Sequence, residues 1–355
     1  MIWISLGLVG ILFLTFPLSN YYIKLGIKIP TGLQLSIGIA GILLIYIALY
    51  YGIRALFDNK DKNQRGQGKY KRGKRHSKNN PKVVILGGGT GLAILLRGLK
   101  QFITDITAIV TVADDGGSSG KLREDLGMLP PGDIRNCILA LAEMEPTMEE
   151  LLQYRFSEGS LKGQSFGNLF IASMNGISRN FEEAIKKISE VLAVTGRVYP
   201  VTLEDITLYA ELENGLVVKG ESSIPDKVLQ EGSPIDRVFI EPKGAKGLGE
   251  AVEAIYNADL VLLGPGSLYT SIIPNLLIKN VAEALGKTKA KKIYICNMMT
   301  QPGETDYYGV KQHLEAILNH CPKINIDYII CNNGEILGVA YDKYQEEGAR
   351  LILVT

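Results

Sequence analysis

The sequence predicts an α/β protein with a Rossmann-like, doubly wound and mostly parallel sheet. This sheet is expected to carry a small β-rich insertion and to follow a two-helix transmembrane hairpin. Short, continuous apolar runs recur from residue 83 onward, and helical patterns separate them. A glycine-rich turn follows the first run, and polar loops follow three others. Continuous apolar strands that alternate with helices are typical of a parallel sheet covered on both faces.

Five strands are predicted for this sheet, and helical patterns precede the last three of them. The strands are expected at residues 83–86, 106–112, 260–263, 293–296 and 328–331. The helical patterns cover residues 249–258, 278–285 and 310–318. The segment at about 196–242 differs, because strand-like pieces such as Val217–Gly220 and Val238–Ile240 alternate there with turn residues. We interpret that segment as the β-rich insertion.

The glycine-rich turn at residues 87–91 predicts a phosphate site. It joins the first apolar strand to a helix-like run, so bare backbone N–H groups and a helix N-terminus meet there. Leu92 stands where G-x-G-x-x-G needs its last glycine, and no Gly-Lys-Ser/Thr of a Walker A loop follows. A tight turn that needs glycine only for packing is the alternative. The expected phosphate-binding residues are Gly88, Gly89, Thr90 and Gly91.

A second loop, at residues 114–120, begins with two adjacent carboxylates. Asp114 and Asp115 end the second predicted strand, and Gly-Gly-Ser-Ser-Gly follows them. One of the two can accept a hydrogen bond from a ribose hydroxyl, as acidic residues do in Rossmann sites. Both are also candidates for a Mg²⁺ site beside a diphosphate. An aspartate-capped turn without a ligand is the alternative.

Two further loops follow later strands, at residues 264–271 and 297–305. Ligands of doubly wound sheets bind at the carboxyl ends of the strands. All four loops are therefore expected to meet at one rim of the sheet and to form a composite site. In the loop at 264–271, the residues expected at a diphosphate are Gly264, Gly266 and Ser267.

Two segments between the second strand and the insertion add polar candidates. Asp133 is either a helix N-cap or a ligand contact, and Arg135 opposes the dipole of its helix, which favours an anion partner. Residues 163–167 match G-x-S-x-G, but a loop precedes them instead of the strand that a serine hydrolase needs. The residues expected to contact the ribose, the sugar or Mg²⁺ are Asp114, Asp115, Ser118, Ser119, Asp133, Arg135, Asn136, Ser165 and Asn168.

Two uncharged apolar segments precede the globular part, at about residues 2–22 and 33–53. Each is long enough to cross a hydrocarbon core of about 30 Å, and aromatic residues lie towards the ends of the segments. The expected organisation is a membrane hairpin at 1–56, a basic disordered linker at 57–80 and a cytosolic domain at 81–355.

Charge is divided unevenly along the chain. The first 82 residues carry 13 Lys and Arg against two Asp, whereas the other residues carry 25 against 35 Asp and Glu. The positive-inside rule then predicts a cell-membrane protein with two spans, whose main domain and N-terminus are both cytoplasmic. The linker is expected to contact anionic lipid. Nucleic-acid binding is disfavoured, because the acidic domain would repel a phosphate backbone.

The cysteines and histidines show no metal-binding or disulfide pattern. The four cysteines form no C-x-x-C, and no histidine lies at a zinc-ligand spacing from them, so we expect reduced thiols. His313 and His320 are expected to be ordinary core or surface residues.

Taken together, these motifs resemble the gluconeogenesis factor (YvcK-like) family of the CofD-like superfamily. The resemblance covers nearly all of residues 81–340 and rests on several long motifs in the family's order. The motifs occupy residues 87–91, 113–120, 130–136, 165–169, 263–271 and 297–305. Two departures stand out: Gln164 replaces an expected His, and the chain ends at Thr355, before an expected final helix.

The resemblance implies a Rossmann-like fold that binds a nucleotide diphosphate sugar, typically UDP-N-acetylglucosamine, without established catalysis. It also implies a role in cell shape and envelope synthesis on gluconeogenic carbon sources. The expected function is a membrane-tethered regulator without an assigned catalytic residue; its expected partners are envelope-synthesis proteins and further copies of this chain. The related transferase branch moves a phospholactyl group from a guanosine diphosphate carrier to a deazaflavin with Mg²⁺, so a transferase of this type is the alternative.

Overall fold

The computed structural model describes residues 36, 39–40, 80–144, 146–334 and 339–354. The chain divides into two units, Met1–His76 and Ser77–Thr355. Apart from residues 36, 39 and 40, the predicted membrane spans at 2–22 and 33–53 lie outside the described residues, as does the linker up to residue 79. Within the described part of the chain, no helix has the length and apolar character needed to cross a membrane.

The second unit is built on a six-stranded sheet in the order β3-β2-β1-β7-β8-β9, and every neighbouring pair is parallel. Its strands are β1 (Val83–Gly87), β2 (Ile106–Val110), β3 (Arg197–Pro200), β7 (Leu260–Leu263), β8 (Lys291–Ile295) and β9 (Tyr328–Ile330). The chain proceeds from β1 outward to β3, returns to β7 on the other side of β1, and continues to β9. This order confirms the predicted Rossmann-like sheet, whose strand order reverses between β1 and β7.

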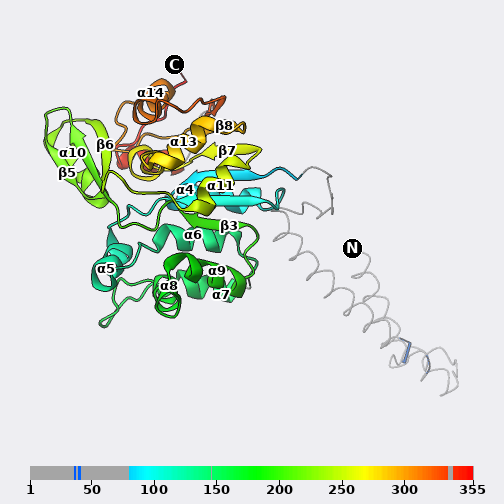
Figure 1. Cartoon of the computed structure of the whole chain (residues 1–355). Helices are drawn as coiled ribbons and strands as arrows, with labels where there is room; N and C mark the ends of the chain where they lie inside the picture. The colour runs from blue at the N-terminus through cyan, green and yellow to red at the C-terminus, as the bar shows by residue number, and fades with distance from the viewer. Residues whose placement is uncertain (1–35, 37–38, 41–79, 145, 335–338, 355) are drawn as a thin grey trace, which may run out of the picture. The chain divides into compact units, whose positions relative to one another are not determined.

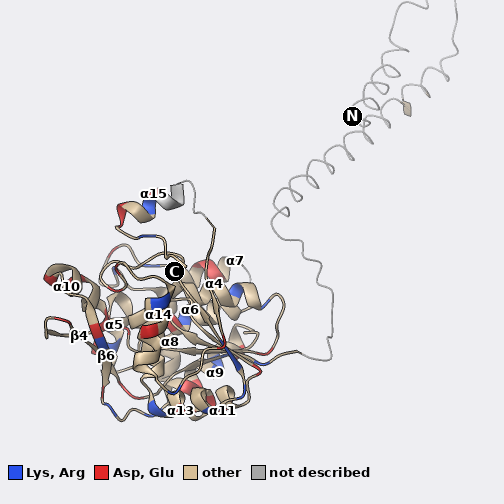
Figure 2. Cartoon of the chain, turned by 90° about the horizontal axis from the view of Figure 1, so that it is seen from above, with Lys and Arg blue, Asp and Glu red and all other residues tan. Residues whose placement is uncertain are grey.

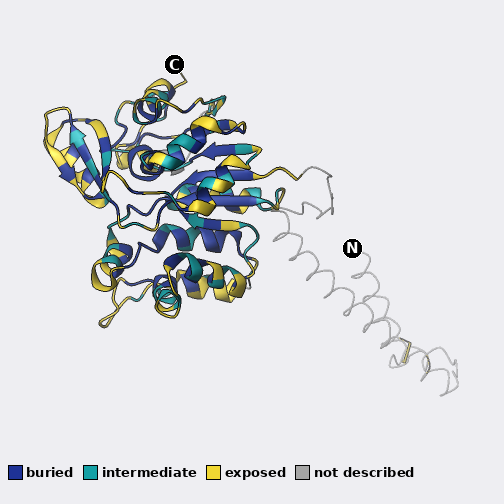
Figure 3. Ribbon diagram, in the orientation of Figure 1, coloured by how far each residue is buried: buried dark blue, intermediate teal, exposed yellow. Residues whose placement is uncertain are grey.

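The strands are apolar because helices lie on both sides of the sheet (Figure 1). β1 and β2 are buried at every position, and Figure 3 shows buried strands beside helices with exposed outer faces. α4 (Gly89–Leu99) packs against α6 (Gly132–Leu141), and α11 (Gly249–Tyr256) packs against α13 (Lys279–Lys287). Figure 2 shows Lys and Arg interspersed with Asp and Glu on the outer helices and loops.

Further helical segments connect these elements. They are α5 (Gly117–Leu126), α7 (Pro146–Gln153), α8 (Phe166–Gly176), α9 (Phe181–Val191), the π-helical η2 (Leu268–Ile272), α12 (Ile273–Leu276), α14 (Val310–His320) and α15 (Val339–Glu346). The predicted helices at 249–258, 278–285 and 310–318 correspond to α11, α13 and α14, with ends that differ by one or two residues.

The β-rich insertion is a separate antiparallel sheet in the order β5-β4-β6. It contains β4 (Thr207–Leu212), β5 (Val217–Lys219), the 3₁₀ turn η1 (Glu221–Ser223), α10 (Ile224–Glu231) and β6 (Ile235–Glu241). The predicted start of the insertion at residue 196 was wrong, because β3 belongs to the main sheet. β3 is a four-residue strand at the edge of the sheet, and it ends in a proline. Proline is tolerated in edge strands, but in a sequence it lowers the expectation of a strand.

Candidate functional site

The glycine-rich turn after β1 faces the loop after β7 across the point where the strand order reverses. β1 and β7 pair in register along the sheet, so their carboxyl ends lie side by side. A Cβ placed on Gly91 would lie 3.3 Å from the Pro265 carbonyl oxygen. This close approach of two backbones explains the glycine at position 91 and brings two of the predicted loops together.

The N-terminus of α4 presents backbone donors where these two loops meet. Gly88 is the N-cap, and as a glycine it has no side chain to cap the helix. The Gly89 N–H donates to the Asp133 carboxylate, which reaches over from α6. The N–H groups of Thr90 and Gly91 belong to the first helical turn, whose donors have no partner within a helix. Like the Gly88 N–H, these two groups have no hydrogen-bond partner among the described residues, so they can donate to a ligand.

Asp133 lies against the glycine turn and does not cap its own helix. α6 has Pro131 as its N-cap, so the interpretation of Asp133 as an N-cap was wrong. A Cβ on Gly88 would lie 2.6 Å from the Asp133 Oδ2 atom. Burial raises the pKa of Asp133 to about 6; the Gly89 N–H bond lowers it, and the nearby Asp114 carboxylate raises it.

Three more helices begin at the same rim, α5, α6 and α8, and in none of them does the side chain of the N-cap residue cap the helix. Ser119 of α5 accepts a hydrogen bond from the Gly132 N–H at the start of α6, at 3.1 Å. The Ser118 hydroxyl donates to Gln164 Oε1 at 2.7 Å and accepts from Asn168 Nδ2 at 3.1 Å. Each helix N-terminus carries about half a positive charge, so their meeting favours an anion.

Arg135 is the cation of this rim. Its Nη1 donates to Ser165 Oγ and, at 2.8 Å, to Asn168 Oδ1, and its Nη2 donates to Asn136 Oδ1 at 3.0 Å. The Arg135 Nε atom is buried without a partner among the described residues. Burial lowers the pKa of Arg135, and the charge of Arg155 adds to that shift. The guanidinium is thus held by neutral oxygens, and the predicted anion partner is not a described carboxylate.

Gln164 stands where the family resemblance implies a His, and it is buried inside this network. Its side-chain oxygen accepts from Ser118, which in turn accepts from Asn168 and from the Ser165 N–H at 3.3 Å. The Gln164 side chain therefore takes part in the hydrogen-bond network that links the starts of α5 and α8.

The two adjacent aspartates have different surroundings. Asp114 Oδ1 accepts from the Gly116 N–H at 2.9 Å, which is the predicted aspartate-capped turn. Its Oδ2 atom lies 3.4 Å from a Cβ placed on Gly132, so it faces the start of α6. Asp115 Oδ1 accepts from the Ser222 N–H of the insertion at 2.9 Å. Asp114 therefore faces the rim, whereas Asp115 anchors the inserted sheet.

A side chain of the loop after β8 holds the loop after β7 in place through hydrogen bonds. Asn297 Nδ2 donates to the Gly266 carbonyl at 2.8 Å, and Asn297 Oδ1 accepts from the Gly266 N–H at 3.3 Å. The Gly264 N–H donates to the Leu86 carbonyl of β1 at 2.9 Å. Both N–H groups thus already have partners, so the proximity of Gly264 and Gly266 to a diphosphate stays a prediction, and it would not use these two donors.

Glu304 is a buried carboxyl that the sequence reasoning missed, although it lies in a motif that was identified. It accepts from Gln301 Nε2 at 2.5 Å, from Thr270 Oγ1 at 3.2 Å and from the Tyr269 N–H at 3.3 Å. Burial raises the pKa of Glu304 to about 7, and the hydrogen bonds from Thr270 and from the Tyr269 N–H lower it. Gln301 Oε1 accepts from the Ser267 hydroxyl at 2.7 Å, so Glu304 positions Ser267 through Gln301.

The last described residues support the loop after β8. The Thr300 N–H donates to the Arg350 carbonyl at 2.7 Å, and the Ile352 N–H donates to the Met298 carbonyl at 3.0 Å. No sequence pattern indicated this pairing, because about fifty residues separate the partners.

Among the described residues, His313, His320 and the four cysteines make none of the hydrogen bonds at the rim. His320 accepts from the Val238 N–H through Nε2 at 2.9 Å, and its Nδ1 donates to the Ala316 carbonyl at 2.7 Å. Burial lowers the pKa of both His313 and His320. The histidines are thus packed among neighbouring elements, as expected, and all four cysteines are free thiols.

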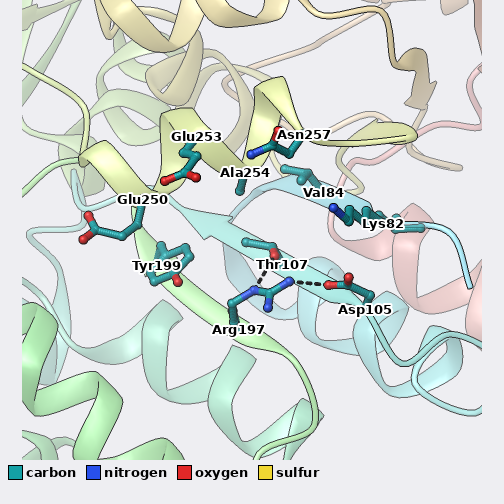
Figure 4. A pocket seen from close by; sticks show the side chains of 11 residues that line it. Lys82, Val84, Asp105, Thr107, Arg197, Tyr199, Glu250, Glu253, Ala254 and Asn257 are labelled. Atoms are coloured by element: carbon teal, nitrogen blue, oxygen red, sulfur yellow. Dashed lines mark hydrogen bonds and ion pairs between the residues drawn. The ribbon is translucent and has the colours of Figure 1, made fainter.

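A cavity of about 330 Å³ lies at the opposite end of the sheet (Figure 4). It is lined by the first residues of β1, β2 and β3 and by α11. Arg197 forms an ion pair with Asp105 there, and its Nε donates to Thr107 at 3.2 Å. None of the predicted site residues lines this cavity, and ligands of such sheets bind at the other, carboxyl end.

Comparison with known proteins shows to which family the chain belongs. Residues 83–354 match the family model described as 2-phospho-L-lactate transferase CofD. The chain belongs to the CofD family. Relatives of this CofD-family protein carry the description gluconeogenesis factor, among them one from Bacillus subtilis, which is 50% identical over 271 residues, or 76% of this chain and 84% of that protein. A Clostridium acetobutylicum relative is 50% identical over 368 aligned positions, or 99% of this chain and 80% of that protein.

A solved structure supports the same assignment. The crystal structure of a UPF0052 family member from Bacillus halodurans matches this CofD-family chain with a TM-score of 0.75 and 49% sequence identity. The match covers 78% of this chain and 88% of that one. The predicted family is thereby confirmed.

Proposed function

We propose that this CofD-family protein is a membrane-tethered regulator that binds a nucleotide diphosphate sugar of the UDP-N-acetylglucosamine type. As a gluconeogenesis factor, it would support cell shape and the envelope on gluconeogenic carbon sources. One observation carries the proposal: the N-terminus of α4, with the N–H groups of Thr90 and Gly91 unpaired among the described residues, lies where the strand order reverses, beside three other helix N-termini and Arg135. Such positions bind nucleotide phosphates in doubly wound sheets.

Each part of the rim has a role in this proposal. The N–H groups of Thr90 and Gly91 donate to the diphosphate, whose charge the helix dipoles and Arg135 offset. Ser165 and Asn168 hold the guanidinium in place. Asp114 keeps one carboxylate oxygen for a ribose hydroxyl, because its other oxygen is bonded to the Gly116 N–H.

We expect Mg²⁺ to bind together with the diphosphate. Asp114 and Asp133 lie close enough for one charge to raise the pKa of the other. In the described ranges, no group of three or more His, Cys, Asp and Glu able to hold a metal is found. Mg²⁺ commonly uses one or two carboxylates and completes its shell with phosphate oxygens and water, and it would neutralise phosphate charge there. Asp114 and Asp133 match that pattern better than Asp115, which is bonded to Ser222.

The test is calorimetric titration of the full chain in detergent with UDP-N-acetylglucosamine, with and without Mg²⁺. Saturable binding with a stoichiometry near one per chain is expected. Absence of binding at millimolar ligand, with a folded protein by circular dichroism, would overturn the proposal.

The membrane tether rests on the two apolar segments at 2–22 and 33–53 and on the basic linker that follows them. Alkaline carbonate extraction is the test. The full chain should stay with the membrane, and a chain without residues 1–56 should be released. Release of the full chain would contradict the tether.

A transferase is the second candidate, favoured by the description of the matching family model. Asp133, with a pKa of about 6, is an acid that can release a proton near neutral pH at the rim. The experiment is turnover of a guanosine diphosphate-linked phospholactyl donor with a deazaflavin acceptor and Mg²⁺. Turnover that disappears in Asp114→Asn would favour the transferase, and its absence in a protein that binds the donor would favour the regulator.

A further inference from the structure

The loop after β7 and η2 carry three aliphatic hydroxyl side chains, and one of them has no partner. The Ser267 hydroxyl donates to Gln301 at 2.7 Å, and the Thr270 hydroxyl donates to Glu304 at 3.2 Å. The Ser271 hydroxyl forms no hydrogen bond with any described residue. Ser271 is only 7% exposed, yet its oxygen is not one of the atoms sealed from solvent without a partner, so a ligand can reach it.

The Ser271 hydroxyl faces the N-terminus of α4. Gly89 is the first residue of α4, and its φ is +68°. A Cβ built on Gly89 would have one neighbour within 4 Å outside its own helix and the adjacent residues, which is the Ser271 Oγ atom at 3.8 Å. Cβ atoms built on Gly88 and Gly266 would each lie 3.3 Å from the Ser271 Cβ atom. The hydroxyl therefore borders an open space beside the first turn of α4.

Backbone hydrogen bonds and a buried amide hold Ser271 in this position. The N–H groups of Ser271 and Ile272 both donate to the Ser267 carbonyl at 3.0 Å, which forms the π-helical turn of η2. Asn275 of α12 is fully buried, and its Nδ2 atom donates to the Ser271 carbonyl at 2.8 Å and to the Gly87 carbonyl at 3.3 Å. The Asn275 side chain thus connects Ser271 to the end of β1, where the glycine-rich turn begins. Short π-helical turns are frequent at functional sites.

We propose that the Ser271 hydroxyl donates a hydrogen bond to a phosphate oxygen of the bound diphosphate. The inference rests on the proposed nucleotide-sugar function and adds a side-chain donor to that site. Alanine would fill the same space without the cost of a desolvated hydroxyl, so packing alone does not account for a serine here. The free N–H groups of Gly88, Thr90 and Gly91 and the dipole of α4 favour an anion in the space that this hydroxyl borders. The loop after β7 thus contributes a side chain, since the N–H groups of its two glycines already have partners.

Calorimetry on the full chain in detergent tests this hydroxyl with UDP-N-acetylglucosamine and with UDP, since both carry the diphosphate. Ser271→Ala should weaken binding of both ligands by the same factor, about 10-fold or more, as expected when a hydrogen bond to a charged group is lost. The melting temperature of the ligand-free protein should not fall, because the hydroxyl has no partner among the described residues. Ser189→Ala is the matched control: the Ser189 hydroxyl donates to the Ile185 carbonyl within α9 at 2.8 Å, and neither affinity should change.

The outcomes separate the two proposals. If the unmodified chain binds neither ligand, the proposed function fails, and the role of Ser271 fails with it. If the chain binds both ligands and Ser271→Ala binds them within about twofold of the unmodified chain, only the role of Ser271 is overturned. Weaker binding of UDP-N-acetylglucosamine with unchanged binding of UDP would place the hydroxyl at the sugar and would overturn its phosphate contact.

A second variant separates hydrogen bonding from packing. Ser271→Cys keeps a side chain of similar shape but carries a weaker donor, so its affinities should lie between those of the unmodified chain and of Ser271→Ala. Affinities below those of Ser271→Ala, or a lower melting temperature of ligand-free Ser271→Ala, would show that the side chain acts through packing and would overturn the phosphate contact.

Discussion

The N–H group of Thr90 provides the sharpest test of the phosphate cradle. Thr90 is the second residue of α4, and its side chain is exposed. Proline is tolerated in the first turn of a helix, because the N–H that it removes has no partner within the helix. Thr90→Pro therefore deletes one backbone donor at the rim and leaves the helical hydrogen bonds of α4 intact.

The expected effect follows from the kind of hydrogen bond that is lost. A hydrogen bond to a charged group contributes about 1.5–3 kcal/mol. Loss of one such bond to a diphosphate oxygen therefore weakens binding by about 10- to 150-fold. Folding stability should change by much less, since the deleted donor has no partner in the free protein.

Calorimetry with UDP-N-acetylglucosamine and with UDP measures this loss. Thr90→Ala is the matched control, because it removes the hydroxyl and keeps the N–H; it should bind within about threefold of the unmodified chain. Thr90→Pro should weaken both ligands, since both carry the diphosphate. If Thr90→Pro binds as tightly as Thr90→Ala, with equal melting temperatures, the phosphates do not lie at α4 and the assignment of the cradle is refuted.

Three further predictions concern stability and reactivity. Asp115→Ala should lower the free energy of unfolding by about 1 kcal/mol through loss of the Ser222 hydrogen bond, whereas Asp115→Asn keeps an acceptor; equal denaturant midpoints for the two would contradict the anchor. Glu304 has a folded pKa of about 7, above its usual 4.5, so its contribution to stability is complete below pH 4.5 and is lost as the pH rises to 7. The melting temperature of the unmodified chain minus that of Glu304→Gln should therefore fall over this range, by the equivalent of at most about 3 kcal/mol, and a flat difference would disprove the shift. Cys331 is half-buried and the other cysteines are buried, so a thiol reagent should label Cys331 first in the native protein; equal labelling rates would count against this packing.

Local sequence patterns were sufficient to predict most of the main sheet. Five of the six strands were recognised, because parallel strands buried on both faces are continuous apolar runs. The four loops were placed at one rim for a topological reason: parallel strands finish at the same edge. β3 was missed, since four residues with an exposed arginine and a terminal proline carry too weak a signal.

The chemistry of the rim depended on contacts between distant segments. Ser118, Arg135, Ser165 and Asn168 were selected one at a time, and the structure joins them in a single hydrogen-bond network. The residue types indicated polar contacts, but the partners lie about thirty to fifty residues away. Sequence reasoning could name these side chains and could not show how they hold one another.

The sequence by itself determined the strand–turn–helix unit at Gly87–Gly91, the alternation of strands and helices, and the edge of the sheet at which the four loops meet. These features follow from local properties: hydrophobic periodicity, backbone freedom at glycine and the direction of parallel strands. The tertiary structure alone decided that Asp114 faces the rim while Asp115 anchors the insertion, and that Glu304 holds Ser267 of the loop after β7 through Gln301. Burial and neighbouring charge exist only once segments far apart in the chain are packed together, so they determine the pKa of a carboxyl and its partner in a way that no local pattern encodes.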